Sequence, residues 1–160
     1  MKSYQHTVII GIVEAKMMLI STKGRYALRI LIDMAEQSGN NYIKLKDIAE
    51  RQGISEKYLE SIVKQLVAHH IVVGLRGKGG GYRLNMEPDA INVGEVLRFM
   101  EGNLAPVACL EDGGEACPHV AECRTLEFWR GLDDAIRRYT DSFTVADLTR
   151  TDGSGFDYII

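Results

Sequence analysis

Two short amphipathic segments separated by a tight glycine turn constrain the fold of this chain more than any other feature. The apolar positions of residues 45–49 mark a short helix that ends at Gly53. Ser55 can cap a second helix, and Glu56 lies in its first turn, where the helix dipole favours an acidic side chain. Helix, glycine turn and helix in this order predict a helix-turn-helix.

A β-hairpin is predicted directly after the second helix. Residues 71–75 read Ile-Val-Val-Gly-Leu, a stretch that is rich in β-branched residues and too short for a helix. Residues 82–84 offer a partner strand across a loop that holds four glycines and the two cations Arg76 and Lys78. Together with a helix predicted upstream, these elements make residues 18–88 one winged helix-turn-helix unit.

The rest of the chain is predicted to form helices around one long loop. Residues 102–123 are rich in glycine and acidic residues and show no periodicity, and they hold every cysteine of the chain. A helix is expected before this loop, and a long amphipathic helix with Trp129, Leu132 and Ile136 on one face is expected after it. We divide the chain into an N-terminal extension (1–17), the winged helix-turn-helix (18–88), the cysteine loop with its helices (89–150) and a C-terminal tail (151–160).

Charge is distributed unevenly along the chain. The formal net charge is −3, yet residues 18–88 hold 11 lysines and arginines against 7 acidic residues, whereas residues 89–160 hold 6 against 14. This split predicts a basic half that can face phosphate and an acidic half with a different task. A chain of 160 residues that is 46% apolar can also form a core without disulfides, so its three cysteines need another explanation.

The sequence gives no sign of a membrane protein. No apolar run reaches the roughly 18 residues that are needed to span a bilayer. The short apolar run at residues 8–13 is followed by Glu14 and Lys16 and fits a secretory signal poorly. We therefore expect a cytoplasmic protein.

Polar side chains of the second predicted helix and of the hairpin are the candidate DNA contacts. Ser55, Lys57 and Tyr58 suit contacts to phosphates or bases, and Glu60 could accept a hydrogen bond from a cytosine amino group. Arg76 lies among glycines, and an arginine in such a loop suits a narrow minor groove. The alternative is that these side chains form a solvated surface. The full candidate set is Ser55, Lys57, Tyr58, Glu60, Ser61, Lys64, Arg76, Lys78 and Tyr82.

Motifs typical of enzymes are missing from the sequence. The glycine-rich loop does not match the GxxxxGK[ST] pattern of nucleotide-binding loops, and it precedes a strand instead of a helix. Neither a metal-hydrolase helix motif nor a nucleophile elbow occurs. We therefore expect a protein without enzymatic activity.

Four stretches together are similar to one known family. They are Ser-Thr-Lys-Gly-Arg-Tyr-Ala at 21–27, Ile-Ala-Glu-Arg-Gln-Gly-Ile-Ser at 48–55, Tyr-Leu-Glu at 58–60 and Arg-Gly-Lys-Gly-Gly-Gly-Tyr at 76–82. The chain resembles, over residues 19–150, the winged-helix regulators that include IscR, NsrR, RirA and CymR. The resemblance implies a homodimeric transcription factor that binds double-stranded DNA through Tyr58, Glu60 and Arg76. The implied fold is mainly α with a small β-hairpin wing, a winged helix-turn-helix plus a long C-terminal dimerisation helix.

The cysteines are the candidate metal ligands. Gaps of seven and five residues separate Cys109, Cys117 and Cys123, which argues against a zinc finger and a Cys-Xaa-Xaa-Cys redox motif. Three thiolates on a loop can instead hold three irons of a cluster, and the resemblance implies an iron-sulfur cluster on this loop. Some family members have a histidine where Leu126 stands, so the fourth ligand is open between His119, an acidic residue of the loop or the partner, and an exogenous molecule. This ligand set favours [4Fe-4S] over [2Fe-2S].

Two functions are carried forward from the sequence. The first is a homodimeric transcriptional regulator that senses iron, redox state or cluster supply through the cysteines. The second is a cluster-free regulator of cysteine or sulfur metabolism that acts through a docked enzyme or a thiol switch. Residues 157–160, Asp-Tyr-Ile-Ile, resemble the isoleucine-ending tail of the cysteine-metabolism repressors, which makes cysteine synthase a candidate partner.

Overall fold

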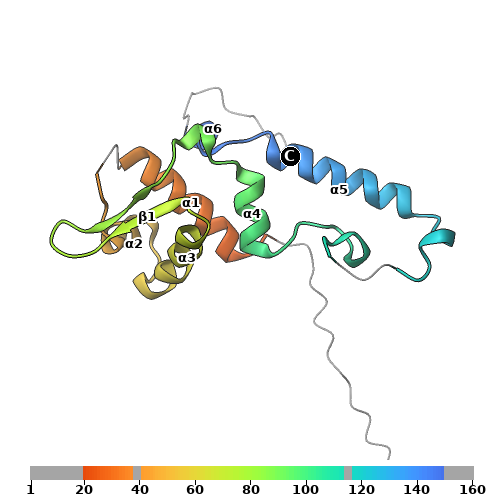
Figure 1. Cartoon of the computed structure of the whole chain (residues 1–160), viewed down its shortest axis with the longest axis horizontal. Helices are drawn as coiled ribbons and strands as arrows, with labels where there is room; N and C mark the ends of the chain where they lie inside the picture. The colour runs from red at the N-terminus through yellow and green to blue at the C-terminus, as the bar shows by residue number, and fades with distance from the viewer. Residues whose placement is uncertain (1–19, 38–40, 114–116, 150–160) are drawn as a thin grey trace, which may run out of the picture.

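The structure is a computed structural model that describes residues 20–37, 41–113 and 117–149. Its mainly helical fold with one small antiparallel hairpin confirms the predicted fold class (Figure 1). Residues 1–17 and 151–160, predicted as an extension and a tail, lie outside the described residues. The elements are α1 (Thr22–Gln37), α2 (Leu45–Gln52), α3 (Glu56–Ala68), β1 (Val72–Leu75), β2 (Gly81–Leu84), η1 (Pro88–Ala90), α4 (Val93–Glu101), η2 (Ala108–Leu110), η3 (Val120–Glu122), α5 (Leu126–Asp141) and α6 (Val145–Thr149).

Side-chain caps and a glycine fix the ends of the first helices. Ser21 Oγ accepts hydrogen bonds from two backbone N–H groups at the start of α1, at 3.1 and 3.3 Å. Ser55 Oγ accepts one from the Tyr58 N–H at 3.3 Å, which confirms its predicted role as the cap of α3. Between α2 and α3, Gly53 adopts the left-handed conformation with φ 65° and ends α2. The helix-turn-helix is therefore specified by local signals.

The predicted hairpin forms, and it pairs with a third segment that the sequence did not indicate. β1 and β2 are antiparallel, with Leu75 opposite Gly81 at the tip. The backbone of Ile43, just before α2, exchanges hydrogen bonds of 2.9 and 2.7 Å with that of Tyr82. A Cβ at Gly81 would collide with the backbone of Ile43, so glycine is required for this close approach. The hairpin is thereby fastened beside the helix-turn-helix.

α1 is the central helix of the fold. It packs against α2, α3, α4, α6 and β2. Its inward side chains Ala27, Ile30, Leu31 and Met34 follow helical spacing and are fully buried. Each fully buried Ile, Leu or Met stabilises the fold by about 1.5–3 kcal/mol. The winged helix is therefore held together mainly through α1.

Asp33 is the one buried charged side chain in the described part of the chain, with 4% exposure. Its carboxylate accepts hydrogen bonds from Arg51 Nε at 2.9 Å, from Arg51 Nη2 at 2.6 Å and from Gln52 Nε2 at 2.9 Å. The hydrogen bond to Asp33 raises the pKa of Arg51. Arg29 adds bonds to the side-chain and backbone oxygens of Gln52 at 2.9 and 3.0 Å. This network ties α1 to the end of α2, immediately before the turn into α3.

α4 joins the winged helix to α5. At its C-terminal end, Glu101 accepts hydrogen bonds from the Ser21 N–H at 3.0 Å and from the Ser21 hydroxyl at 2.9 Å. Gly24 leaves room for this carboxylate, since a Cβ there would collide with Glu101. Arg98 Nη1 donates to Asp141 Oδ1 of α5 at 2.7 Å. One short helix is therefore bonded to both α1 and α5.

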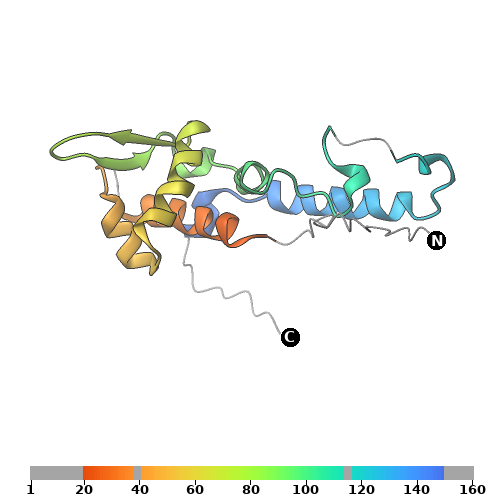
Figure 2. The ribbon, with the colours of Figure 1, turned by 90° about the horizontal axis from the view of Figure 1, so that it is seen from below.

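α5 extends away from the winged helix, so the hairpin and the cysteine-bearing segments lie at opposite ends of the molecule (Figures 1 and 2). Ile136 packs against the cluster that Val93 and Leu97 of α4 form with Leu104. Phe128 and Tyr139, on the same side of α5 as Leu132, are 66% and 61% exposed. The apolar side of α5 is therefore used inside the chain only in part, and two of its aromatic side chains stay largely exposed.

The described residues include no helix that is long and apolar enough to cross a membrane.

We expect Asp33→Ala to lower the free energy of unfolding by about 3 kcal/mol, because it leaves Arg51 and Gln52 without their buried acceptor. Urea unfolding followed by circular dichroism measures the change. Glu36→Ala, on the exposed side of the same helix, is the control and is expected to stay within about 0.5 kcal/mol of wild type. Equal effects of the two substitutions would contradict a structural role for the network.

Candidate DNA-contacting groove and thiol pocket

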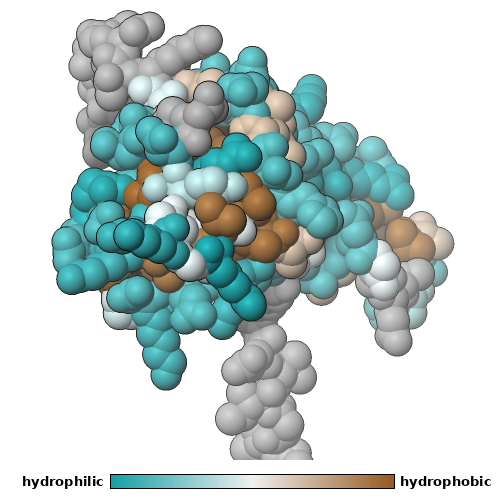
Figure 3. All heavy atoms as spheres, turned by 60° about the vertical axis from the view of Figure 1, so that its left-hand side comes forward, coloured by the Kyte–Doolittle hydropathy of each residue, from teal (hydrophilic) through white to brown (hydrophobic). Residues whose placement is uncertain are grey.

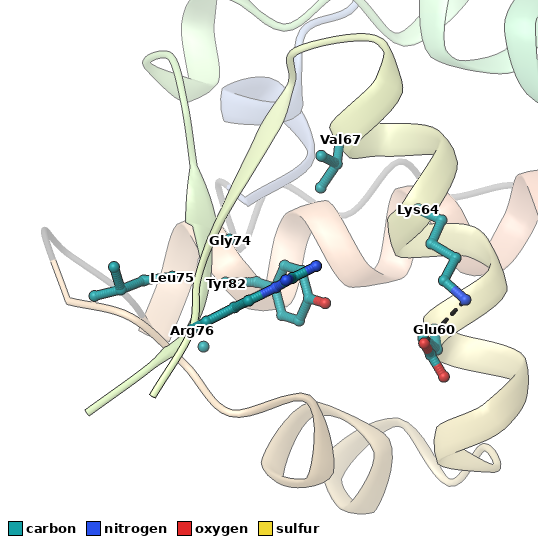
Figure 4. A pocket seen from close by; sticks show the side chains of 8 residues that line it. Glu60, Lys64, Val67, Gly74, Leu75, Arg76 and Tyr82 are labelled. Carbon is teal, nitrogen blue, oxygen red and sulfur yellow. Dashed lines mark ion pairs between the residues drawn. The ribbon is translucent and has the colours of Figure 1, made fainter. Parts of the chain in front are cut away.

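A groove between α3 and the hairpin collects four of the nine predicted DNA contacts. Figure 4 shows Glu60 and Lys64 on α3, with Arg76 and Tyr82 extending from the hairpin toward that helix. The sequence predicted these side chains on two separate elements, and the fold brings them together. The groove has a volume of about 510 Å³ and is lined by Glu60, Lys64, Val67, Gly74, Leu75, Arg76, Gly81 and Tyr82.

The charged side chains at the groove are available for other partners. Lys64 Nζ lies 3.0 Å from Glu60 Oε1, and the two side chains are 70% and 48% exposed. An exposed pair one helical turn apart contributes about 0.3–0.5 kcal/mol, so either group can be drawn away at little cost. Arg76, Lys57 in the first turn of α3 and Lys78 at the hairpin tip are also exposed. The groove therefore presents two cations, Lys64 and Arg76, and the carboxylate of Glu60, and two further lysines lie on the elements that form it.

Three predicted contacts take part in the structure of α3 itself. The Ser55 hydroxyl caps the helix, and the Ser61 hydroxyl donates to the backbone oxygen of Tyr58 at 2.7 Å. The half-buried ring of Tyr58 lies edge-on to Tyr26, with 6.0 Å between ring centres. The guanidinium of Arg29 lies over the ring of Tyr26, 5.0 Å from its centre. The sequence did not indicate this contact. Tyr58 is therefore held in a defined position at the start of α3.

The surface around the hairpin is mainly hydrophilic. Figure 3 shows hydrophilic side chains over most of this end of the molecule, with hydrophobic ones gathered near its centre. Val67 and Leu75 supply the apolar part of the groove lining. A polar surface with exposed cations suits the phosphates and sugars of a nucleic acid better than an apolar ligand.

A smaller pocket at the other end of the molecule collects all three cysteines. Cys109 lies in η2 and Cys123 directly follows η3, so two short 3-10 turns present the thiols where the sequence predicted an irregular loop. Leu126 and Arg130 of α5 complete the wall. The pocket has a volume of about 140 Å³ and is lined by Cys109, Leu110, Cys117, Val120, Cys123, Leu126 and Arg130.

The thiols of this pocket have the chemistry of a soft-metal site. All three are free, and Cys109 is exposed. Hydrogen bonds from the hydroxyl and then the backbone N–H of Thr125 lower the pKa of Cys123, which favours the metal-binding thiolate. Within the described residues, no three Cys, His, Asp or Glu side chains are arranged to hold a single metal ion. Thiolates are soft ligands of the kind that bind zinc and iron-sulfur clusters.

The pocket wall bears on the fourth ligand. Leu126 lines the pocket and has no donor atom, whereas His119 is exposed and is not among the lining residues. The structure therefore does not bring His119, one of the predicted alternatives, into the pocket wall.

Comparison with known proteins identifies the family. The profile of the Rrf2 family, described as an iron-dependent transcriptional regulator, matches residues 20–151. The chain belongs to the Rrf2 family. It is a transcriptional regulator and not an enzyme, as the sequence predicted.

Individual relatives agree with this assignment. The HTH-type transcriptional regulator CymR of Bacillus subtilis is 41% identical over 143 residues, which cover 89% of this chain and 98% of CymR. The HTH-type transcriptional regulator IscR of Sodalis glossinidius is 37% identical over 131 residues, which cover 82% of this chain and 78% of IscR. The solved structure of CymR, described as the global cysteine regulator of B. subtilis, has a TM-score of 0.67 at 40% identity and covers 82% of this chain and 95% of CymR. The predicted winged helix-turn-helix and the family resemblance are confirmed.

Arg76→Ala is expected to weaken binding to a duplex selected by the wild-type protein from a random pool by about ten-fold, and to reduce the salt dependence by about one ion. The reason is that the substitution removes an exposed cation from the groove. Fluorescence anisotropy at several salt concentrations measures both quantities. Arg138→Ala, on α5 and remote from the groove, is the matched control. An Arg76→Ala protein with unchanged affinity and salt slope would exclude this side chain from the interface.

Proposed function

We propose that this Rrf2-family protein is a homodimeric, cytoplasmic DNA-binding regulator that senses iron, redox state or cluster supply through an iron-sulfur cluster. Cys109, Cys117 and Cys123 are its proposed ligands. The observation that carries the proposal is the single pocket that all three cysteines line. Held by these three thiolates, a cluster would supply redox-active iron to this part of the chain.

The groove between α3 and the hairpin is the proposed reading face. In a winged helix-turn-helix, the start of the second helix enters the major groove of the DNA. In this chain Ser55, Lys57 and Tyr58 lie at the start of that helix. Glu60 can accept a hydrogen bond from a cytosine amino group once Lys64 turns toward a phosphate. Arg76 suits a narrow minor groove. The proposal also includes the remaining predicted contacts Ser61, Lys78 and Tyr82.

The exposed aromatic side of α5 is the proposed dimer interface. Phe128, Leu132 and Tyr139 follow spacings of four and seven residues and share one side of the helix. Phe128 and Tyr139 remain largely exposed in the single chain. Aromatic side chains dominate the energetics of protein interfaces, so a second copy of α5 is a suitable cover. Dimerisation would also place two reading faces on one palindromic site.

α4 is suited to connect the two ends of the molecule. Phe99 of α4 stacks on His69, which follows α3, with 4.1 Å between ring centres. Glu101 of the same helix holds the start of α1, and the chain then runs directly into the cysteine-bearing segment. A change in that segment could therefore shift the position of α3 through α4, which would be a population shift between two arrangements.

Three cysteines leave one coordination position of a cubane open, which favours [4Fe-4S] over [2Fe-2S]. The described pocket wall offers no fourth oxygen or nitrogen ligand apart from the cationic Arg130, which does not bind iron. We assign the fourth position to an acidic residue of the loop or of the partner subunit, or to an exogenous small molecule. Glu115 of the loop lies outside the described residues.

A cluster-free regulator of cysteine or sulfur metabolism is the second candidate, and the 41% identity with CymR favours it. In this second candidate, either the thiols act as a redox switch, or an enzyme such as cysteine synthase docks on the tail at residues 157–160. The tail lies outside the described residues. Both candidates share the DNA-binding face. They differ in whether the pocket binds iron.

The visible absorption spectrum, iron content and acid-labile sulfide of protein purified without oxygen separate the two candidates. We expect broad absorption near 400 nm, on the order of four irons and four sulfides per chain, and a molar mass about twice that of the monomer. The variant with all three cysteines changed to alanine is the matched control and should be colourless. A colourless wild-type protein after reconstitution with iron and sulfide would contradict the cluster and favour the second candidate.

A further inference from the structure

One side of α5 faces the cysteine-bearing segments with four aligned residues. Leu126, Arg130, Asp133 and Arg137 follow spacings of four, three and four, so they lie on the same side of the helix. Leu126 and Arg130 line the thiol pocket. The other two reach the segment between Cys109 and Cys117 through an ion-pair network.

Arg137 lies at the centre of this network. Its Nε donates to Asp133 Oδ2 at 2.8 Å, within α5. Its Nη2 donates to both carboxylate oxygens of Asp112 at 3.3 Å. Asp112 follows Cys109 by three residues and is the point at which this segment is bonded to α5. The guanidinium thus bridges a helix carboxylate and a loop carboxylate.

Asp133 holds the guanidinium in place. Its side chain is 13% exposed, and its Oδ1 is buried without a hydrogen-bond partner among the described residues. Because a mostly buried carboxylate is destabilising without a partner, the hydrogen bond from Arg137 to Asp133 Oδ2 is costly to break. The hydrogen bond to Asp133 also raises the pKa of Arg137, which keeps the bridge charged. Arg137 is therefore pre-oriented toward Asp112 and pays little additional entropy to bind it.

We propose that Arg137 is a positioning residue for the thiol pocket, and that its ion pair with Asp112 holds the Cys109 segment against α5 so that Cys109 faces Cys123. Cys109 and Cys123 are fourteen positions apart in the sequence. Without the Arg137–Asp112 ion pair, the effective concentration of one thiol at the other would be set by the length of this loop. The inference rests on the proposed function only for the use of the pocket. Since it concerns the iron-free chain, it can hold or fail independently of cluster binding.

The test measures how close Cys109 and Cys123 lie in the full-length, metal-free protein. In a Cys117→Ser background, the protein is equilibrated with a glutathione redox buffer. Each Cys109–Cys123 disulfide that forms converts one glutathione disulfide into two glutathiones, so the equilibrium constant gives the effective concentration of the two thiols. Asp112→Asn and Arg137→Gln are each expected to lower this effective concentration by about two- to five-fold, the range of an exposed ion pair. The double variant should lose no more than the larger single effect.

Three controls distinguish positioning from a general loss of structure. Arg138→Gln changes the neighbouring arginine, whose Nε donates to the backbone oxygen of Asp134 within α5, and should have no effect. The Cys117–Cys123 pair, measured in a Cys109→Ser background, should not respond to Asp112→Asn. Salt at about 1 M should bring the wild-type value down to that of the variants, because it screens the exposed pair.

Several results would overturn the proposal. It fails if the Cys109–Cys123 disulfide does not form in the Cys117→Ser background, or if adding Asp112→Asn leaves the effective concentration of this pair unchanged. Additive effects of Asp112→Asn and Arg137→Gln would show that the two side chains act separately. Equal losses for both cysteine pairs would indicate a disturbed loop instead of a positioned Cys109. Iron and sulfide content, measured separately, reports on the proposed cluster alone.

Discussion

The buried carboxylate of Asp33 determines how the first helices of the fold meet. A charge at 4% exposure destabilises a fold unless it is hydrogen-bonded, and here Arg51 and Gln52 meet that need. Because both partners lie at the end of α2, the requirement fixes where α2 ends against α1. Ser55 then starts α3 only a few residues later. The orientation of α3, the helix proposed to contact DNA, therefore follows from one electrostatic requirement inside the central helix.

α4 extends this constraint to the other half of the molecule. Glu101 bonds the start of α1, Phe99 stacks on His69 behind α3, and Arg98 pairs with Asp141 at the end of α5. α4 therefore contacts both the end of α3, through His69, and the end of α5, through Asp141. This arrangement separates two tasks along one axis, since the basic half of the sequence carries the groove and the acidic half carries the thiols. A regulator needs such a separation with a connection between its parts.

The elements that the sequence could predict are those specified by short-range signals. Gly53 and Ser55 mark the helix-turn-helix within a few residues, and the glycine-rich stretch marks the hairpin. The pairing of Ile43 with Tyr82 could not be predicted, because it joins segments about forty residues apart and leaves no periodic pattern. Similarly, the helical spacing of apolar residues shows that α5 has an apolar side, but not which of these residues pack against α4. Ile136 packs against the cluster that includes α4, whereas Phe128 is exposed. The cysteines were predicted as ligands from their number and spacing, whereas the pocket wall needed the fold.

We propose that the thiol pocket controls the candidate DNA-contacting groove at the opposite end of the chain. The most direct measurement compares the DNA affinity of protein purified without oxygen with that of the variant in which Cys109, Cys117 and Cys123 are alanine. Both are titrated against the same selected duplex at one salt concentration. We expect the two affinities to differ by about five-fold or more, the lower end of typical coupling between sites, with equal helical content. Equal affinities of the two proteins would contradict it.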